Sequence, residues 1–360
     1  MHRIAHPFSP VRLRVAPPPI TPALAGIGQI RERLQAAGAG AGHAQRVLRL
    51  WVQALPQDSG RRPTDSFLPR TLRAALPALV ADLAALARLR SQHPAADGSV
   101  RLLVELGDGQ CVESVLLPAG GLCISTQLGC AVGCVFCMTG RAGLSRQLGS
   151  AEIVAQVALA RTLRPVRKLV LMGMGEPAHN LDSVMEAIEL LGTEGAVGHK
   201  NLVFSTVGDR RVFERLPQGR VKPALSLSLH STRAELRAQL LPRAPRIAPD
   251  ELVALGDAYA RATGHPIQFQ WTLLDGVNDG DDEVEAIVAL LSGKRAMMNL
   301  IPYNTVAGLP WRRPSWARAV EMARALNRLG ILTRLRRSAG QEVDAGCGQL
   351  RARHDAPAAA

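Results

Sequence analysis

The chain has 360 residues, of which 47% are hydrophobic, and 43 Lys or Arg against 30 Asp or Glu give it a formal charge of +13. This length favours one large domain with an accessory region over a single small domain. The positive charge favours a polyanionic partner such as RNA, although an arginine-rich surface would give the same total. No apolar run reaches the roughly 18 residues of a membrane span, and the N-terminus has no secretory signal. We therefore expect no membrane partner and a cytoplasmic location.

The first hundred residues divide into two parts. Residues 1–22 are rich in proline, which predicts an irregular arm. From residue 23 to residue 98 we predict a small helical accessory domain of three or four helices, because apolar residues such as Leu72, Leu76 and Leu79 recur at helical spacing. Basic residues on one of these helices, Arg46 and Arg49, could contact RNA phosphates, although a solvated helix face is the simpler explanation for each.

Residues 99–121 change from a helical period to an alternating one. Two β-branched and leucine-rich runs flank Gly107 and Gly109. This pattern predicts a β-hairpin. We expect the hairpin to connect the helical domain to the rest of the chain.

Strands and helices alternate from residue 122 to residue 339, which is typical of an α/β fold with a parallel sheet or barrel. The predicted strands are 122–127, 167–172, 201–206, 223–229, 266–274, 296–301 and 331–336. The predicted helices are 150–163, 181–192, 209–216, 233–240, 249–263, 281–291 and 314–329. Six βα units would form an open, partial barrel, with the seventh strand added at an edge. Residues 340–360 are rich in glycine and alanine, and we expect a mobile C-terminal tail.

Three clustered cysteines follow the first predicted strand. Cys130, Cys134 and Cys137 have the spacing C-x3-C-x2-C. Thiolates suit iron–sulfur clusters or zinc. A structural zinc site is closed by four protein ligands, whereas three thiolates on a 4Fe–4S cluster leave one iron open for a substrate or cofactor. We therefore expect a 4Fe–4S cluster, with a zinc knuckle as the alternative.

Further polar groups follow later strands, at the edge where ligands bind in such folds. Residues 173–177 include Gly175, where the backbone could approach a ligand, and Glu176, whose carboxylate could bind an ammonium group. Taken singly, His230 would be a structural histidine and Asn304 a turn residue. Together, at the ends of successive strands, they are expected to bind one cofactor. The candidates at these strand ends are Ser205, Ser228, Leu229, His230 and Asn304.

The order of these motifs resembles the RlmN/Cfr family of radical S-adenosylmethionine (SAM) RNA methyltransferases. The resemblance covers residues 99–351 and includes Cys123 before the cluster and Cys347 in an Asp-Ala-Gly-Cys-Gly-Gln-Leu segment. It implies a partial radical-SAM barrel, one 4Fe–4S cluster on the three clustered cysteines and two SAM molecules per turnover. It also implies that Gly175, Glu176 and the strand-end candidates bind SAM.

The resemblance further implies methylation of an adenosine ring carbon, C2 rather than C8, in rRNA or tRNA. Such a carbon is electron-poor and cannot attack the methyl group of SAM directly, so the task is divided through a covalent intermediate. Cys347 would accept a methyl group from one SAM, and a 5′-deoxyadenosyl radical from a second SAM would remove hydrogen from it before it adds to the ring. Cys123 would resolve the adduct through a transient disulfide with Cys347, and Glu113 would accept a proton. The implied partners are RNA and an electron donor such as flavodoxin or ferredoxin, and we expect a monomer.

The sequence departs from the family pattern at several motifs. The run Ser205-Thr206-Val207-Gly208 replaces Ser-Thr-Ser-Gly, which indicates a divergent branch. One alternative is a radical-SAM enzyme that acts on a protein or other non-RNA substrate, and another is a zinc-stabilised RNA-binding protein. Neither explains the pair Cys123 and Cys347. Without the resemblance, Glu113 would be read as an exposed strand residue.

Overall fold

The computed structural model describes residues 24–60, 62–306 and 308–352. The stretch expected to form an irregular arm, residues 1–22, lies outside the described residues, as does the end of the expected tail. Across the described ranges, no helix is both long and apolar enough to cross a membrane.

A ten-stranded sheet forms the centre of the molecule, in the order β1-β2-β3-β4-β7-β8-β9-β10-β11-β12. From β4 onward the neighbouring strands are parallel. This is the expected α/β partial barrel, and β12 lies at the edge beside β11, where the added strand was predicted. The parallel strands are β4 (Gly121–Cys123), β7 (Lys168–Leu171), β8 (Leu202–Thr206), β9 (Ala224–Ser228), β10 (Ile267–Leu273), β11 (Ala296–Pro302) and β12 (Thr333–Leu335).

Seven helices follow these strands and agree with the predicted ranges to within two residues at each end. Strand side chains alternate between two surroundings: Leu225 and Leu227 of β9 join the main apolar core, whereas Ser228 faces a cavity. Because successive side chains of a strand point to opposite faces, one face of the sheet packs in the apolar core and the other faces the polar interior of the barrel. The helices are α5 (Ser150–Leu163), α6 (Leu181–Gly192), α7 (Arg210–Arg215), α8 (Ala234–Leu240), α9 (Pro249–Thr263), α10 (Asp281–Leu291) and α11 (Trp316–Arg328).

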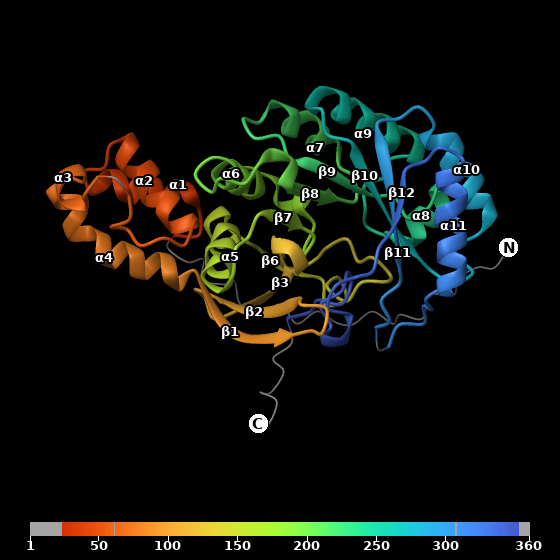
Figure 1. Cartoon of the computed structure of the whole chain (residues 1–360), viewed down its shortest axis with the longest axis horizontal. Helices are drawn as coiled ribbons and strands as arrows, with labels where there is room; N and C mark the ends of the chain where they lie inside the picture. The colour runs from red at the N-terminus through yellow and green to blue at the C-terminus, as the bar shows by residue number, and fades with distance from the viewer. Residues whose placement is uncertain (1–23, 61, 307, 353–360) are drawn as a thin grey trace.

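The N-terminal region projects from one side of the barrel (Figure 1). It contains α1 (Ile27–Ala36), α2 (Ala41–Val52), α3 (Thr64–Phe67) and α4 (Arg70–Ala85). The expectation of helices up to residue 98 is not met, because β1 (Ala87–Pro94) is a strand paired antiparallel with β2 (Val100–Leu106). β1 is mostly polar and lacks the apolar alternation that would predict a strand from sequence. Its strand conformation depends on pairing with β2.

The predicted hairpin is present, but it belongs to the main sheet. β2 pairs with β3 (Cys111–Leu117), and β3 pairs antiparallel with β4. The predicted strand 122–127 is divided into β4 and a separate short strand, β5 (Gln127–Gly129). β5 pairs with β6 (Leu144–Gln147), which was not predicted, and the pair brings together the two ends of the cysteine loop, residues 130–143.

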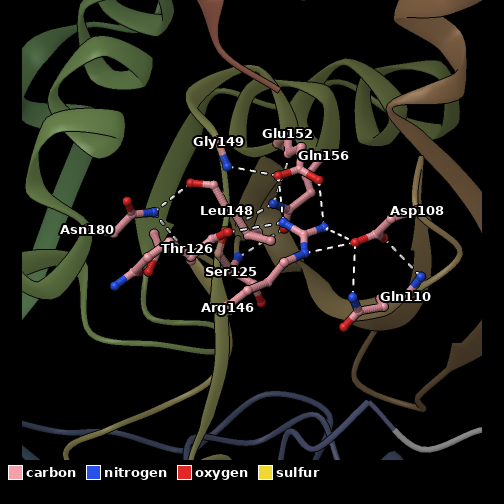
Figure 2. A network of polar contacts seen from close by, with 11 residues as sticks. Asp108, Gln110, Ser125, Thr126, Arg146, Leu148, Gly149, Glu152, Gln156 and Asn180 are labelled. Carbon is pink, nitrogen blue, oxygen red and sulfur yellow. Dashed lines mark hydrogen bonds and ion pairs between the residues drawn. The ribbon is translucent and has the colours of Figure 1, made fainter. Parts of the chain in front are cut away.

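A buried ionic network joins β6, at the end of this loop, to the hairpin and to α5 (Figure 2). The Arg146 guanidinium contacts Asp108 of the hairpin turn at 2.7 Å and Glu152 of α5 at 2.8 Å. Glu152 also accepts a hydrogen bond from the Gly149 N–H at 2.8 Å, which caps the helix. The three charged side chains are at most 10% exposed, so removing one leaves its partners buried without compensation.

Replacing this arginine should therefore destabilise the fold. We expect Arg146→Leu to lower the free energy of unfolding by about 3–5 kcal/mol, because Glu152 and Asp108 would remain charged and buried. Urea unfolding followed by circular dichroism measures the change. The control is Arg33→Leu, which breaks the exposed pair Arg33–Asp82, with side chains 41% and 48% exposed, and should cost less than about 1 kcal/mol. Equal effects of the two substitutions would contradict the assigned importance of the network.

Candidate active site

The cysteine loop is anchored by apolar packing and by backbone hydrogen bonds. Val132 and Phe136 are buried in a second apolar cluster. The Val135 N–H donates to the Leu240 carbonyl at 3.1 Å, and the Trp311 indole N–H donates to the Val135 carbonyl at 2.9 Å. The loop is therefore held from both sides, which fixes the positions of its cysteines.

Cys130, Cys134 and Cys137 all line a smaller cavity of about 150 Å³ at the strand ends. Burial raises the pKa of Cys130 to about 12, and burial together with the neighbouring Cys137 and Cys130 raises that of Cys134 well above its usual value. Three thiolates can share so dry a place only if a cation neutralises them. The donors therefore fit a metal group that binds thiolates, such as an iron–sulfur cluster.

The cysteine loop supplies three thiols to this cavity, rather than the four protein ligands of a closed structural zinc site. Within the described ranges, no three His, Cys, Asp or Glu side chains converge as ligands of one metal ion. The donor set fits the expected 4Fe–4S cluster, on which three thiolates leave one iron open.

The loop of residues 173–177 needs its glycines for packing within the protein. Gly175 has a φ of 107°, and a Cβ at Gly173 would lie 2.6 Å from the Ile124 carbonyl oxygen. We expected these glycines to allow close approach to a ligand. The structure shows that they also bring the loop against residues 124–127, and the Gln127 amide oxygen accepts a hydrogen bond from the Glu176 N–H at 2.7 Å.

Glu176 is a buried carboxylate on the wall of the smaller cavity. Its oxygens accept hydrogen bonds from the Ala178 N–H at 3.0 Å and the Val207 N–H at 2.9 Å. Burial nevertheless outweighs these bonds and raises the pKa of Glu176 to about 7. A ligand ammonium group would replace the lost hydration and favour the ionised form.

Most of the other predicted cofactor contacts meet at this cavity. Ser205, Ser228, His230, Asn304 and Gly175 line it. Leu229 is the exception: its side chain is buried in the main core, and its N–H donates to the Gln270 carbonyl at 3.1 Å. A Leu229 contact with a ligand would therefore need its backbone.

His230 is held as a neutral hydrogen-bond donor. Burial, with a smaller effect of Arg237, lowers its pKa to about 3. Its Nδ1 accepts a hydrogen bond from the Thr272 N–H at 2.9 Å, which leaves the ring proton on Nε2. The ring also packs edge-on against Phe136, with 4.9 Å between ring centroids. His230 thus has a structural hydrogen bond through Nδ1, as expected for this residue taken singly, and it can still donate to a ligand through Nε2.

The described part of the tail, residues 340–352, is docked on the cysteine loop. The Met138 N–H donates to the Gly348 carbonyl at 2.7 Å, and the Thr139 hydroxyl donates to the Leu350 carbonyl at 2.7 Å. The Asn304 amide donates to the Cys347 carbonyl at 2.9 Å. Asn304, expected to contact a cofactor, therefore holds the tail. The tail is packed in this arrangement, and its expected mobility remains a prediction.

Docking brings Cys347 to the same cavity as Cys123, although they are far apart in the sequence. Both line a larger cavity of about 550 Å³, which Cys137 also borders. Burial, with the adjacent Cys347, raises the pKa of Cys123 to about 12. The Cys347 side chain is exposed within this cavity. Desolvation by the surrounding residues nevertheless raises its pKa, whereas the charge of Arg336 acts in the opposite direction. Both cysteines are free thiols here.

Glu113 lies beneath the tail and is buried, contrary to the reading as an exposed strand residue. It pairs with Arg101 at 2.5 Å and accepts hydrogen bonds from the backbone N–H groups of Arg351 at 2.7 Å and Ala352 at 3.0 Å. It is not among the described residues that line the two cavities. Its predicted role as a proton acceptor would require the tail to leave these bonds.

Sequence reasoning missed several residues of the site. Arg237 is buried, donates to the Ser228 carbonyl at 3.2 Å and has its charge near Cys134. Gln270 borders both cavities, and Asn299 lines the larger one. No motif marks these residues, but the alternation of polar and apolar residues in the predicted strand 266–274 could have identified Gln268 and Gln270 as facing the interior.

Comparisons with known proteins agree with this geometry. A family model described as the radical SAM superfamily matches residues 124–291. The chain is 71% identical over 330 residues to a protein of Leptothrix cholodnii named "Probable RNA methyltransferase", covering 92% of this chain and 95% of that one. It is 72% identical over 327 residues to a similarly named protein of Methylibium petroleiphilum, covering 91% and 93%. A crystal structure of a radical SAM methyltransferase from Sphaerobacter thermophilus has a TM-score of 0.80 and 34% identity, covering 93% of this chain and 100% of that one.

The raised pKa of Glu176 predicts pH-dependent binding of SAM. Below about pH 7 the carboxyl is protonated in the free site, and a ligand ammonium can pair with it only after the proton leaves. Affinity should therefore fall by about tenfold per pH unit as the pH decreases below 7. Glu176→Gln should bind SAM more weakly at pH 7.5 and lose this dependence. Equilibrium dialysis of SAM with the cluster-loaded protein tests both, and a wild-type affinity that does not change with pH would contradict the assignment.

Proposed function

The chain belongs to the radical SAM superfamily and, within it, to the RlmN/Cfr family of methyltransferases, and from this premise we propose that it methylates an adenosine ring carbon in RNA. The observation that carries the proposal is the docked tail, which places Cys347 in one cavity with Cys123, beside the cluster cysteines. The names of the two relatives and the charge of +13 support RNA as the substrate.

The cluster and SAM, when bound, would supply the methyl groups and the radical that activates a methyl carbon. Cys130, Cys134 and Cys137 would hold the cluster. Glu176 would bind the amino group of SAM, and the Nε2 proton of His230 would be available to an acceptor on the same ligand. Ser205, Ser228, Gly175 and the Leu229 backbone would complete the site, and Asn304 would orient the tail beside it.

Cys347 would carry the methyl group to the base. A thiol must lose its proton to act as a nucleophile, and the charge of Arg336 favours the thiolate against the effect of desolvation. Cys123 is kept protonated by its raised pKa. After losing this proton, its thiolate would attack the Cys347 sulfur, so that a disulfide forms while the bond between that sulfur and the transferred carbon breaks. In this scheme Glu113 holds the tail in place through residues 351 and 352, and it could accept a proton once the tail moves.

We favour C2 of an adenosine over C8, in rRNA or tRNA, with two SAM molecules used per turnover. A flavodoxin or ferredoxin would donate electrons to a monomeric protein in the cytoplasm. Mass spectrometry of nucleosides from a deletion strain and its complemented counterpart tests the target: one methylated adenosine should disappear on deletion and return on complementation. No change in any methylated adenosine would contradict the proposal.

Cys347→Ser should abolish methylation but not the cleavage of SAM. We expect RNA methylation to fall by roughly 10³-fold or more, as generally happens when a covalent carrier is removed. SAM cleavage should continue, because the cluster cysteines and Glu176 are unchanged. The assay combines reductant, SAM and total RNA. The matched control is Cys111→Ser, which changes a cysteine outside both cavities. Normal methylation by Cys347→Ser would exclude this mechanism, and SAM cleavage that RNA does not affect would favour a protein substrate.

Cys123→Ala should trap the reaction at a later stage. Without the second thiol, the bond between Cys347 and the base cannot be resolved, so a covalent protein–RNA adduct should accumulate to about one per protein in a single turnover. The adduct is measured by denaturing gel electrophoresis before and after nuclease treatment. Absence of the adduct, with methylation at the wild-type rate, would show that Cys123 has no part in resolution.

A further inference from the structure

The larger cavity is lined mostly by residues that have no role in binding the cluster or SAM. Its volume of about 550 Å³ lies within the usual range for small-molecule sites. It adjoins the smaller cavity, and the wall between them includes Cys137, Gln270 and Cys347. A molecule in the larger cavity would therefore lie beside Cys347 without occupying the place assigned to SAM.

Amide side chains line the buried part of this cavity. Gln268 and Gln270 face it from β10, and Asn299 faces it from β11, directly opposite Gln270 in the strand pairing. Asn299 is 2% exposed, and its Oδ1 has no hydrogen-bond partner among the residues that the structure describes. The Gln270 Nε2 donates a hydrogen bond to the Ser226 hydroxyl at 2.8 Å, which fixes the side chain. Its Oε1 can then accept a hydrogen bond from a ligand. An unsatisfied buried amide is costly unless a ligand pairs with it.

Positive charge lines the exposed part of the cavity. Three exposed side chains, Lys168, Arg336 and Arg337, line it, and we call them the rim cations. In the described part of the chain none of the three forms an ion pair with an acidic side chain. Burial and the charges of Arg336 and Arg334 lower the pKa of Lys168, so Lys168 and Arg336 stand close enough to repel one another. Asp97 also lines the cavity, but its carboxylate already accepts hydrogen bonds from Ser99 and Gly340.

We propose that the larger cavity receives the target adenine of the RNA, with Asn299 and Gln270 hydrogen-bonding the edge of the base. Asn and Gln side chains pair with adenine because they present a donor and an acceptor to its N6 and N7. Enzymes that modify a base turn it out of its stack into such a pocket. The rim cations hold the phosphates on either side. This inference rests on the proposed function, and it names the residues that select the base.

The first experiment measures base preference with free nucleotides. Equilibrium dialysis compares adenosine 5′-monophosphate with guanosine 5′-monophosphate on the full-length, cluster-loaded protein, with excess S-adenosylhomocysteine to occupy the cofactor site. The wild type should prefer the adenine nucleotide. Asn299→Leu removes the hydrogen bonds at similar volume, and it should weaken adenine binding by roughly tenfold and reduce the preference. An unchanged affinity in this variant would overturn the proposal.

The second experiment uses surface variants that should fold even if Asn299→Leu does not. Lys168→Ala and Arg337→Ala should each raise the KM for RNA severalfold and lower the salt slope of RNA binding by about one. The control is Arg328→Ala, an exposed arginine at the end of α11, away from the cavity, which should match the wild type. If both rim variants behave like this control, the cavity is not the entrance for RNA.

The outcomes separate this inference from the proposed function. Methylation of RNA by the wild type tests the function, whereas the nucleotide preference tests the cavity. If the wild type methylates RNA but neither Asn299 nor the rim cations affect binding, the inference fails and the function stands. If the wild type binds adenine through Asn299 but methylates no RNA, the function fails and the adenine site stands.

Discussion

The site depends on the contact between the C-terminal tail and the cysteine loop. The tail contributes only backbone carbonyls to these bonds: Gly348 accepts from the Met138 N–H and Leu350 accepts from the Thr139 hydroxyl. The tail is therefore held without the use of its thiol. Gly348 has a φ of 85°, and a Cβ there would lie 3.0 Å from the Phe136 carbonyl oxygen. Only a glycine lets the tail pass so close to the loop. Cys347 thus reaches the two cavities as a result of this single crossing.

Burial then determines the chemical state of the groups around the crossing. The same lack of water raises the pKa of Cys123 and Glu176 and lowers that of His230. Each of these groups is therefore poised near its neutral form until a charged partner arrives. A cluster of iron ions and a ligand with an ammonium group would supply such charges, which explains how so dry a site can contain so many ionisable groups.

The outer parts of the fold support this arrangement from a distance. Arg146 ties the base of the cysteine loop to the hairpin turn and to the start of α5. The hairpin in turn provides Glu113, which holds residues 351 and 352 of the tail. The antiparallel strands added to the barrel sheet are thus more than a connector: they link the loop that would bind the cluster to the tail that would carry the methyl group.

By itself, the sequence determined the parallel strands, their helices and the strand ends that meet at the smaller cavity, because hydrophobic period and spacing are local properties. It also identified Cys123 and Cys347 as a pair, but only through resemblance to a family. The tertiary structure decided what no local pattern contains: β1 as a strand formed by its partner, Asn304 and Glu113 as anchors of the tail, and Asn299 as an unsatisfied amide facing a cavity. Each of these depends on contacts between residues distant in the chain, which exist only after the sheet has formed and the tail has crossed the loop.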